Sequence, residues 1–477
     1  MTKFKENRFR DIYVHSFFQS NYISLTSIVM ISAKVSHFLR FFLCCCLPLP
    51  LLADWQNWRG PNYNGSATGD DSYPVSFDRT KNVKWSFNLD GSSASTPIIV
   101  QDRVFLSGLG RGEGESAEVF LQALCISRAT GKLIWSANSG SGYKPGSGDG
   151  TSSQLDSRSN YSSPSPVASS DKVVFFYGNG DLVAYSLDGD KIWSRNIQQD
   201  FGDFCFQWTF SASPTLWGNF LYLPVLQRDE QVHGRGRDGA VSFLLCLDLS
   251  NGKTVWEHTR ETDARKESRE SFSTIIPHEG NLLVAGGDYL TSHDPKTGKE
   301  LWRWGTWNPA HRQEWWRLVP SPVAGAGQVL VCAPKNAPVY AITLPSDSSI
   351  SPKLSWDSSG NKSITSDVPT PLFYKDHFYV LSDLRMKLSK IKPLDGSVVW
   401  ELDLPGKYKW RASPTAAGGN LYMMNHNAMV LVVSADSGDI LNSVKMGDEY
   451  DDQTRSSIAL SGGQAFIRTN KKLYCIE

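Results

Sequence analysis

The chain has 477 residues, of which 40% are hydrophobic and 20% charged, so it has enough apolar residues to bury a core and is not a disordered chain. Its 48 basic and 48 acidic residues balance, which argues against the basic excess of a general nucleic-acid binder. The length predicts several domains or one large repetitive domain, and 16 tryptophans need a structural explanation.

The N-terminal segment predicts a secretory signal peptide over residues 1–53. Residues 41–52 form an apolar run that contains two prolines and is shorter than the roughly 20 residues needed to span a bilayer. Cleavage is expected after Ala53, and Met30 gives a signal of more ordinary length than the first methionine. The alternative is an uncleaved membrane anchor. We expect a periplasmic or secreted protein without a stable membrane span.

After an N-terminal extension at 54–80, one sequence unit recurs through residues 81–477. Each unit opens with Ser or Thr, usually before Pro, continues with alternating apolar residues, and ends in a polar turn and a Trp. The openings are Thr96, Ser165, Ser213, Ser273-Thr274, Ser321, Thr370, Ser413 and Ser456-Ser457. The repeat tryptophans are Trp85, Trp135, Trp193, Trp256, Trp302, Trp356 and Trp400. Their spacing suits a module of four strands.

Apolar residues within each unit alternate with period two, and no segment of the mature chain sustains a helical pattern over 12 residues. Turns such as Thr130-Gly131 favour tight chain reversal because Gly accepts a positive φ. Each unit therefore predicts four short antiparallel strands. Because one such sheet cannot bury both faces alone, the copies are expected to stack radially as an all-β propeller.

The two ends of the chain are predicted to share one blade. Residues 456–477 hold three strands and lack the final turn and Trp, whereas residues 82–89 supply one strand with Trp85 at the expected place. We therefore predict an eight-bladed β-propeller of four-stranded antiparallel blades, with each repeat Trp packed against the adjoining blade. Two units depart from the pattern, since Asn442 replaces the Trp of the seventh and the fifth lacks a Thr-Gly turn before Trp356.

The pattern Ala-x-Asp-x-x-Thr-Gly-Lys-x-x-Trp resembles the repeat of pyrroloquinoline-quinone (PQQ) type β-propellers, and WQNWRGPNYNG at 55–65 is similar to the start of secreted bacterial members. The resemblance covers essentially all of residues 54–477. It implies a quinoprotein-like propeller of the broad WD40-like kind. The family includes quinoprotein alcohol dehydrogenases and a lipoprotein of the outer-membrane assembly machinery that binds partners without catalysis.

The dehydrogenases of this family resemble one another in two features beside the cofactor. They have adjacent cysteines over the quinone, whereas the adjacent cysteines here, Cys44 to Cys46, lie in the predicted signal peptide. They also hold calcium with a carboxylate and amide set that no residues of this chain match. We therefore predict no cofactor, with PQQ and calcium bound under the alternative reading.

Long insertions are predicted to gather on one face. In an up-and-down blade the connections from second to third strand, and from one blade to the next, leave on the same side. The long insertions all fall in these connections, at 108–119, 138–162, 199–210, 227–240, 258–272, 304–320 and 445–455. We call this side the long-loop face.

Trp and Arg are enriched at binding hot spots, and several occur in these loops and in the connection around residue 410. The predicted ligand-binding residues are Asp203, Trp208, Arg312, Trp315, Trp316, Arg317, Trp410 and Arg411. The alternative is that they seal the mouth of the central channel and pair with neighbouring loops.

No catalytic or metal-binding constellation stands out in the sequence. The acidic run at 448–452 is interpreted as a solvated loop, with calcium binding as the alternative. His278, His293 and His377 lie near turns and are expected to be exposed.

The sequence thus predicts a non-catalytic, monomeric binding or scaffolding propeller of the cell envelope, whose partner is an envelope protein or a carbohydrate-like ligand and not a nucleic acid. The alternative is a PQQ-dependent oxidoreductase with the quinone in the central channel.

Overall fold

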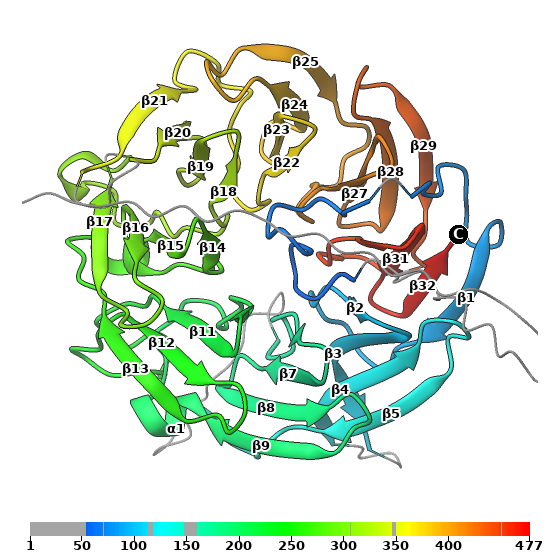
Figure 1. The fold of residues 1–477 in the computed structure, drawn as a ribbon, viewed down its shortest axis with the longest axis horizontal. Coiled ribbons are helices and arrows are strands. Elements are labelled where there is room, and N and C mark those ends of the chain that lie inside the picture. The colour runs from blue at the N-terminus through cyan, green and yellow to red at the C-terminus, as the bar shows by residue number, and fades with distance from the viewer. Residues whose placement is uncertain are drawn as a thin grey trace, which may run out of the picture. The chain divides into compact units, whose positions relative to one another are not determined.

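The computed structural model describes residues 54–69, 71–112, 118–146, 160–305, 307–345, 350–449 and 451–477. The predicted signal peptide and parts of the predicted long insertions at 108–119, 138–162, 304–320 and 445–455 lie outside these residues. Within them the strands form eight four-stranded antiparallel sheets arranged as the blades of a propeller (Figure 1). The predicted all-β, eight-bladed fold is confirmed. No helix in this part of the chain is long and apolar enough to cross a bilayer.

Blades are numbered by the order of their first strands, and within each blade the strands run from the channel outward. Blade 1 holds β2 (Ile98–Val100), β3 (Arg103–Arg111), β4 (Val119–Ser127) and β5 (Leu133–Asn138). Blade 2 holds β6 (Val167–Ala168), β7 (Lys172–Phe176), β8 (Asp181–Ser186) and β9 (Lys191–Asn196). Blade 3 holds β10 (Thr215–Trp217), β11 (Phe220–Val225), β12 (Phe243–Asp248) and β13 (Thr254–Thr259). Blade 4 holds β14 (Ile276–His278), β15 (Asn281–Gly286), β16 (Tyr289–His293) and β17 (Glu300–Trp304).

The second half of the ring repeats this order. Blade 5 holds β18 (Val323–Gly325), β19 (Gln328–Cys332), β20 (Val339–Thr343) and β21 (Lys353–Asp357). Blade 6 holds β22 (Leu372–Tyr374), β23 (His377–Ser382), β24 (Lys387–Ile391) and β25 (Val398–Asp403). Blade 7 holds β26 (Thr415–Ala417), β27 (Asn420–Met424), β28 (Met429–Ser434) and β29 (Ile440–Lys445). Blade 8 holds β30 (Ala459–Ser461), β31 (Gln464–Arg468), β32 (Lys472–Ile476) and β1 (Val83–Asn88).

The ring closes in blade 8, as the two incomplete units predict. Strand β1 pairs antiparallel with β32, and Trp85 lies opposite Cys475 in the register. The two strands lie side by side near the C-terminus in Figure 1. Because β1 supplies the outermost strand of a sheet whose other three strands end the chain, both ends of the repeat array are anchored in one blade.

The repeat tryptophans form the seams between blades. The indole Nε1 of Trp85 donates to the carbonyl of Arg128 at 2.8 Å, and a Cβ built on Gly131, which has a φ of 70°, would lie 2.6 Å from the ring. The glycine of the next polar turn therefore makes room for the indole. The same pairing recurs for Trp135 and Gly189, Trp193 and Gly252, Trp256 and Gly298, Trp356 and Gly396, and Trp400 and Gly438.

The contact between each repeat Trp and the turn glycine of the next blade explains the two irregular units. Trp302 packs in the core shared with blade 5, whose described residues contain no such turn glycine. Asn442 takes the Trp position of blade 7, and its Nδ2 donates to the carbonyl of Phe77 at 3.0 Å. Blade 8 joins its third and fourth strands from opposite chain ends, so the N-terminal extension occupies the place of the missing turn and leaves no glycine to accept an indole.

The Ser and Thr residues that open the units form a hydroxyl belt around the axis. The belt residues are Thr96, Ser165, Ser213, Thr274, Ser321, Thr370, Ser413 and Ser457. In seven seams of the described ring, the backbone N–H of one belt residue donates to the hydroxyl of another, at 2.9 to 3.2 Å. The bond from Ser457 to Thr96 belongs to the seam between blades 8 and 1. The repeated Ser or Thr is thus explained by a buried hydrogen bond between blades.

Replacing a belt hydroxyl is expected to destabilise the ring. In Ser213→Ala the buried N–H of Ser165 loses its acceptor, which costs about 1–3 kcal/mol of the free energy of unfolding. Urea unfolding followed by tryptophan fluorescence measures the change. Ser170→Ala, at an exposed serine that follows β6, serves as the matched control. Equal unfolding midpoints for the two variants would contradict the role of the belt.

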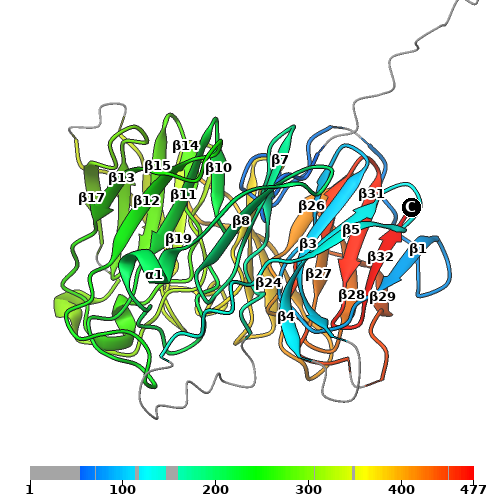
Figure 2. The ribbon, with the colours of Figure 1, turned by 90° about the horizontal axis from the view of Figure 1, so that it is seen from below.

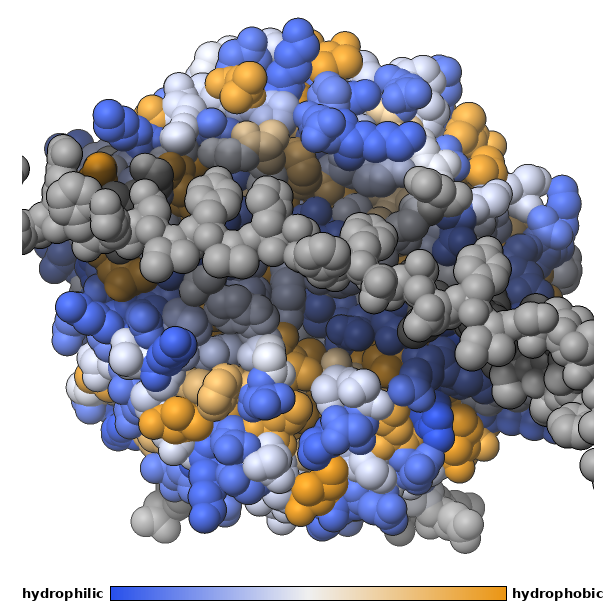
Figure 3. Space-filling view, in the orientation of Figure 1, coloured by the Kyte–Doolittle hydropathy of each residue, from blue (hydrophilic) through white to orange (hydrophobic). Residues whose placement is uncertain are grey.

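The outer rim of the propeller is irregular. Each outermost strand shifts register next to its repeat Trp position, as between Cys246 and Leu247 opposite Trp256 in blade 3. Such bulges twist an edge strand and hinder pairing with another chain. On the face drawn in Figure 3, hydrophobic side chains form small groups separated by polar ones.

The N-terminal extension crosses the channel on the side opposite the long-loop face. Backbone bonds join Trp55 to Ile99 of blade 1 and Asn64 to Phe373 of blade 6, and the Tyr63 hydroxyl donates to a carbonyl of blade 3. Figure 2 shows the blue extension toward one end of the propeller. The extension therefore closes one end of the channel.

Arg59 is a buried side chain of the extension. It is 1% exposed, and its guanidinium donates to the carbonyls of Pro371 at 2.8 Å and Pro414 at 3.0 Å, next to the hydroxyl belt. Burial lowers the pKa of Arg59 to about 9.

The side chains buried within the blades include three cysteines and one histidine. Cys125, Cys246 and Cys475 are buried and lie opposite repeat tryptophans, as small core residues, and burial raises the pKa of each thiol to about 12. The expectation that His293 is exposed is wrong. It is completely buried, bonded to Gly298 and the Thr291 hydroxyl, and burial lowers its pKa to about 4.

Candidate functional site

A cavity of about 390 Å³ lies at the long-loop end of the channel. Eight connections lead from one blade to the next, and described residues from each of them line the cavity wall. The extension closes the channel from the other side, so this axial cavity is a blind site that opens toward the long loops. Its volume is in the range of small-ligand sites, about 300–1,000 Å³.

One repeat position supplies the inner wall. The residue two places before each belt residue lines the cavity, because alternate side chains of an extended segment point the same way. We call these the entry positions: Ala94, Ser163, Ser211, Phe272, Val319, Val368, Arg411 and Arg455. The eightfold backbone is therefore lined by an uneven set of side chains.

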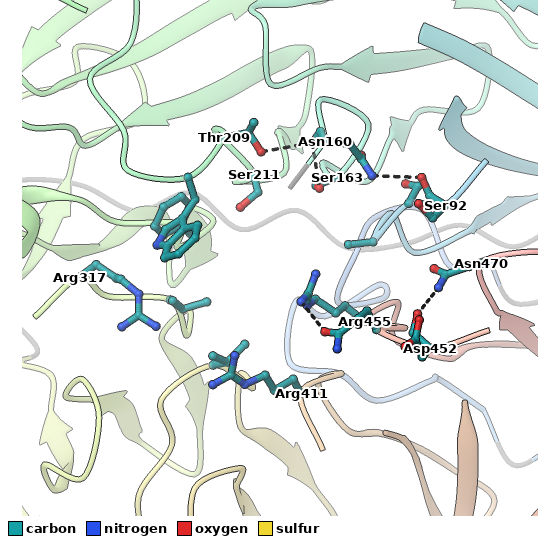
Figure 4. Close-up of a pocket in the computed structure, with 17 residues that line it drawn as sticks. Ser92, Asn160, Ser163, Thr209, Ser211, Arg317, Arg411, Asp452, Arg455 and Asn470 are labelled. Atoms are coloured by element: carbon teal, nitrogen blue, oxygen red, sulfur yellow. Dashed lines mark hydrogen bonds between the residues drawn. The ribbon is translucent and has the colours of Figure 1, made fainter. Parts of the chain in front are cut away.

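A polar group on one side of the cavity is held by its own hydrogen bonds. The Nδ2 of Asn160 donates to the carbonyl of Ser92 at 3.1 Å, and the hydroxyls of Ser163 and Thr209 both donate to the carbonyl of Asn160 at 3.2 Å. Figure 4 shows these residues together, across the cavity from the arginines. The arrangement fixes the loops from blades 1 and 2 and leaves small side chains at the wall.

Three arginines line the other side. The Nη atoms of Arg317 lie 3.3 and 3.4 Å from the carboxylate of Asp367, and Nε of Arg411 donates to Asp383 at 3.0 Å. The Nη2 of Arg455 donates to the side chain of Gln453 at 3.0 Å. Asp367 and Asp383 are buried beside Arg317 and Arg411, so they hold these guanidiniums by one edge.

The pKa of His426 is lowered by burial and by the positive charges near the cavity. Its backbone links the loops around Lys409 and Thr454, and its side chain is 7% exposed. Burial, followed by the charges of Arg455, Arg411 and Lys409, lowers the pKa of His426 to about 3. The imidazole is therefore neutral at physiological pH, and its surroundings are positive.

Three of the eight predicted ligand-binding residues meet at the axial cavity: Trp208, Arg317 and Arg411. Asp203 is bonded instead to the Tyr143 hydroxyl and the backbone N–H of Gly146. Arg312 is exposed outside the cavity wall.

The remaining three predicted residues have different environments. Trp315 is 51% exposed, and its ring lies 5.6 Å from the guanidinium of Arg228 and 5.4 Å from the ammonium of Lys266. Trp316 packs on the core between blades 4 and 5. Trp410 is 0% exposed in the core between blades 6 and 7.

Sequence reasoning missed Arg455, Asn160 and Asn470 of the wall. Arg455 had a usable signal, because it stands two residues before Ser457 just as Arg411 stands two before Ser413. Asn160 and Asn470 had none, since loops of unequal length bring them to the axis.

Other polar clusters do not resemble metal sites. In the described part of the run 448–452, Asp448 pairs with Arg79 at 3.0 Å and Lys472 at 3.3 Å, and Asp451 accepts the backbone N–H of Asn470. Within the described ranges, no group of three or more His, Cys, Asp or Glu side chains is arranged to hold a metal ion.

Solved structures share this architecture. BamB from Moraxella catarrhalis aligns with a TM-score of 0.55 at 11% identity, over 82% of this chain and 96% of that one. A quinohemoprotein alcohol dehydrogenase from Comamonas testosteroni aligns with a TM-score of 0.58 at 12% identity, over 89% of this chain and 80% of that one. At such low identity these likenesses show the fold alone.

Quinoprotein dehydrogenases share local sequence similarity with this chain. The quinoprotein alcohol dehydrogenase PedE of Pseudomonas putida is 38% identical over 71 residues, which are 14% of this chain and 10% of the dehydrogenase. The matched part therefore spans a small fraction of that relative. A family profile, described as outer membrane protein assembly factor BamB, matches residues 67–227, 124–367 and 242–477. These overlapping matches run from the extension to the last strand, and the chain belongs to this family of PQQ-type repeat propellers.

Proposed function

We propose that the protein is a non-catalytic binding or scaffolding module of the cell envelope whose ligand docks at the long-loop face. The observation that carries this proposal is the axial cavity, to which every inter-blade connection contributes while Arg59 and the extension close the other end. A rigid ring that presents loops on one side is a common basis for binding. Membership of the BamB family supports the same reading.

The proposed location is the periplasm or the cell exterior, and the proposed partner is an envelope protein or a carbohydrate-like ligand. The predicted signal peptide supports this location. The exposed Trp315 and Arg312 and the arginines of the cavity supply aromatic surface and planar donors of the kind that dominate binding energies.

Site-specific photo-cross-linking tests the face. We expect a photoreactive residue at Arg312, in a long loop, to give discrete cross-linked species in the native envelope. The matched position is Lys375, which is exposed on the short turn between β22 and β23. Cross-links from Lys375 but not from Arg312, or from neither position, would overturn the proposal.

Quinone chemistry is the alternative proposal, and the residues of the axial cavity fit one part of it. The arginines suit the carboxylates of PQQ, and Trp208 offers a flat surface. The calcium ion does not fit, because Asp452 is the one carboxylate among the residues that line the cavity. Incubation with PQQ and calcium separates the two proposals: stoichiometric binding with dye reduction by an alcohol would replace the first with the second.

A further inference from the structure

The entry positions divide the axial cavity into three sectors. Arg411 and Arg455 stand on consecutive connections and form a cationic sector. The apolar sector consists of Phe272, Val319 and Val368, also on consecutive connections. Small side chains, Ala94, Ser163 and Ser211, complete the ring. The repeated backbone of the eight blades does not require similar side chains to be grouped in this way. The grouping therefore points to the shape and charge of an occupant.

The cationic sector has donors directed to the cavity. The Nε of Arg411 donates a hydrogen bond to Asp383, and its Nη2 lies 3.9 Å from Asp367. The third nitrogen, Nη1, donates to no described residue. Arg455 reaches the wall from the next connection. The residues that line the cavity include three arginines and a single carboxylate, that of Asp452. A carboxylate in this sector would gain charge-assisted hydrogen bonds from the guanidinium groups.

The apolar sector has room for a hydrophobic group beside that carboxylate. Phe272 is 9% exposed and lies in the core cluster that Trp208 and Val319 also contact. The small sector includes the hydroxyls of Ser163 and Ser211, which can accept hydrogen bonds from a polar main chain. The wall therefore suits a carboxylate that is attached directly to an apolar group.

We propose that the axial cavity binds a carboxylate borne on an apolar group, and that its occupant is the C-terminal residue of a partner polypeptide. The cavity is blind, because Arg59 and the extension close it, so a chain can enter by its end but cannot pass through. Its volume of about 390 Å³ has room for the end of a polypeptide chain and not for a folded domain. Capture of a terminal carboxylate is a known mode of peptide recognition. This inference rests on the proposed function.

Fluorescence anisotropy with the full chain tests the inference. The probe is a labelled peptide, Gly-Ser-Gly-Ser-Gly-Phe, with a free C-terminal carboxylate, and the comparison is the same peptide with a C-terminal amide. We expect the free acid to bind at least about tenfold more tightly, because the amide loses the charge-assisted bonds to the arginines. Added salt should weaken the binding of the acid.

Variants locate the binding site. We expect Arg411→Gln and Arg455→Gln each to weaken binding of the free-acid peptide by about tenfold. Arg265→Gln, at an exposed arginine of a long loop outside the cavity, should bind as the unmodified protein does. Because Arg411→Gln removes the partner of buried Asp383, Arg411→Lys serves as a charge-retaining variant, and thermal unfolding of each variant reports whether it is folded.

Several outcomes would overturn the inference. Equal affinity for the acid and the amide, no binding of either peptide, or equal effects of Arg455→Gln and Arg265→Gln would each do so. Binding of 3-phenylpropionate as tight as that of the peptide would assign the site to a small acid and overturn the polypeptide occupant. If the cross-links from position 312 persist while the peptide fails to bind, the proposed function stands and the cavity assignment falls.

Discussion

Replacing Trp410 with alanine is expected to lower the free energy of unfolding by about 3–5 kcal/mol, the range for removing a large aromatic side chain from a core. Trp410 is 0% exposed and packs with Leu404, Leu421 and Leu431 between blades 6 and 7, and its Nε1 donates to the carbonyl of Pro405 at 3.3 Å. Urea unfolding measures the loss. The sequence alone places this residue among the ligand-binding candidates, so the experiment separates a core role from a contact role.

Trp315→Ala is the control for this prediction. The Trp315 side chain is 51% exposed and contacts Arg228 and Lys266 through cation–π interactions, which are worth about 0.5–1 kcal/mol each at exposed sites. We expect a loss of stability of about 1–2 kcal/mol in this variant. A smaller loss in Trp410→Ala than in Trp315→Ala would contradict the assignment of Trp410 to the core.

The second large effect is expected at the closure of the ring. Trp85→Ala removes an indole that is 8% exposed, its hydrogen bond to the carbonyl of Arg128, and its contact with Phe466 at a centroid distance of 6.1 Å. We expect a loss of about 3–5 kcal/mol. Because Trp85 is on the strand that completes blade 8, unfolding should also begin there, and hydrogen exchange of β1 and β32 measures it.

A matched comparison isolates the closure from the general cost of a lost Trp. Trp193→Ala removes the same repeat side chain, with its bond to the carbonyl of Leu249, from a seam within the continuous chain. Both variants should lose stability, but faster exchange in β1 and β32 is expected in Trp85→Ala alone. Unchanged exchange there would show that the extension, and not the Trp seam, holds blade 8 together.

The repeat made the architecture predictable. Its Trp, turn glycine and opening Ser or Thr each make a contact with the next blade, so the spacing of these residues in the chain reports the number and order of blades. The residues of the site were harder to predict from the sequence. Trp208, Arg317 and Arg411 line the cavity, whereas Trp410, one residue from Arg411, lies in the core between blades 6 and 7. Residue type and loop membership do not reveal which way a side chain points.

The all-β class, the eight blades and the sharing of blade 8 by both chain ends follow from the order of the amino acids, because these features depend on local periodicity and on contacts that every unit repeats. Folding in three dimensions determines which side chains share the axial cavity. Arg317, Arg411 and Arg455 are far apart in the chain and come from three different connections, and loop conformation sets their approach. Folding also determines that Arg59 closes the channel, since a single buried arginine bonded to two distant carbonyls has no periodic signal.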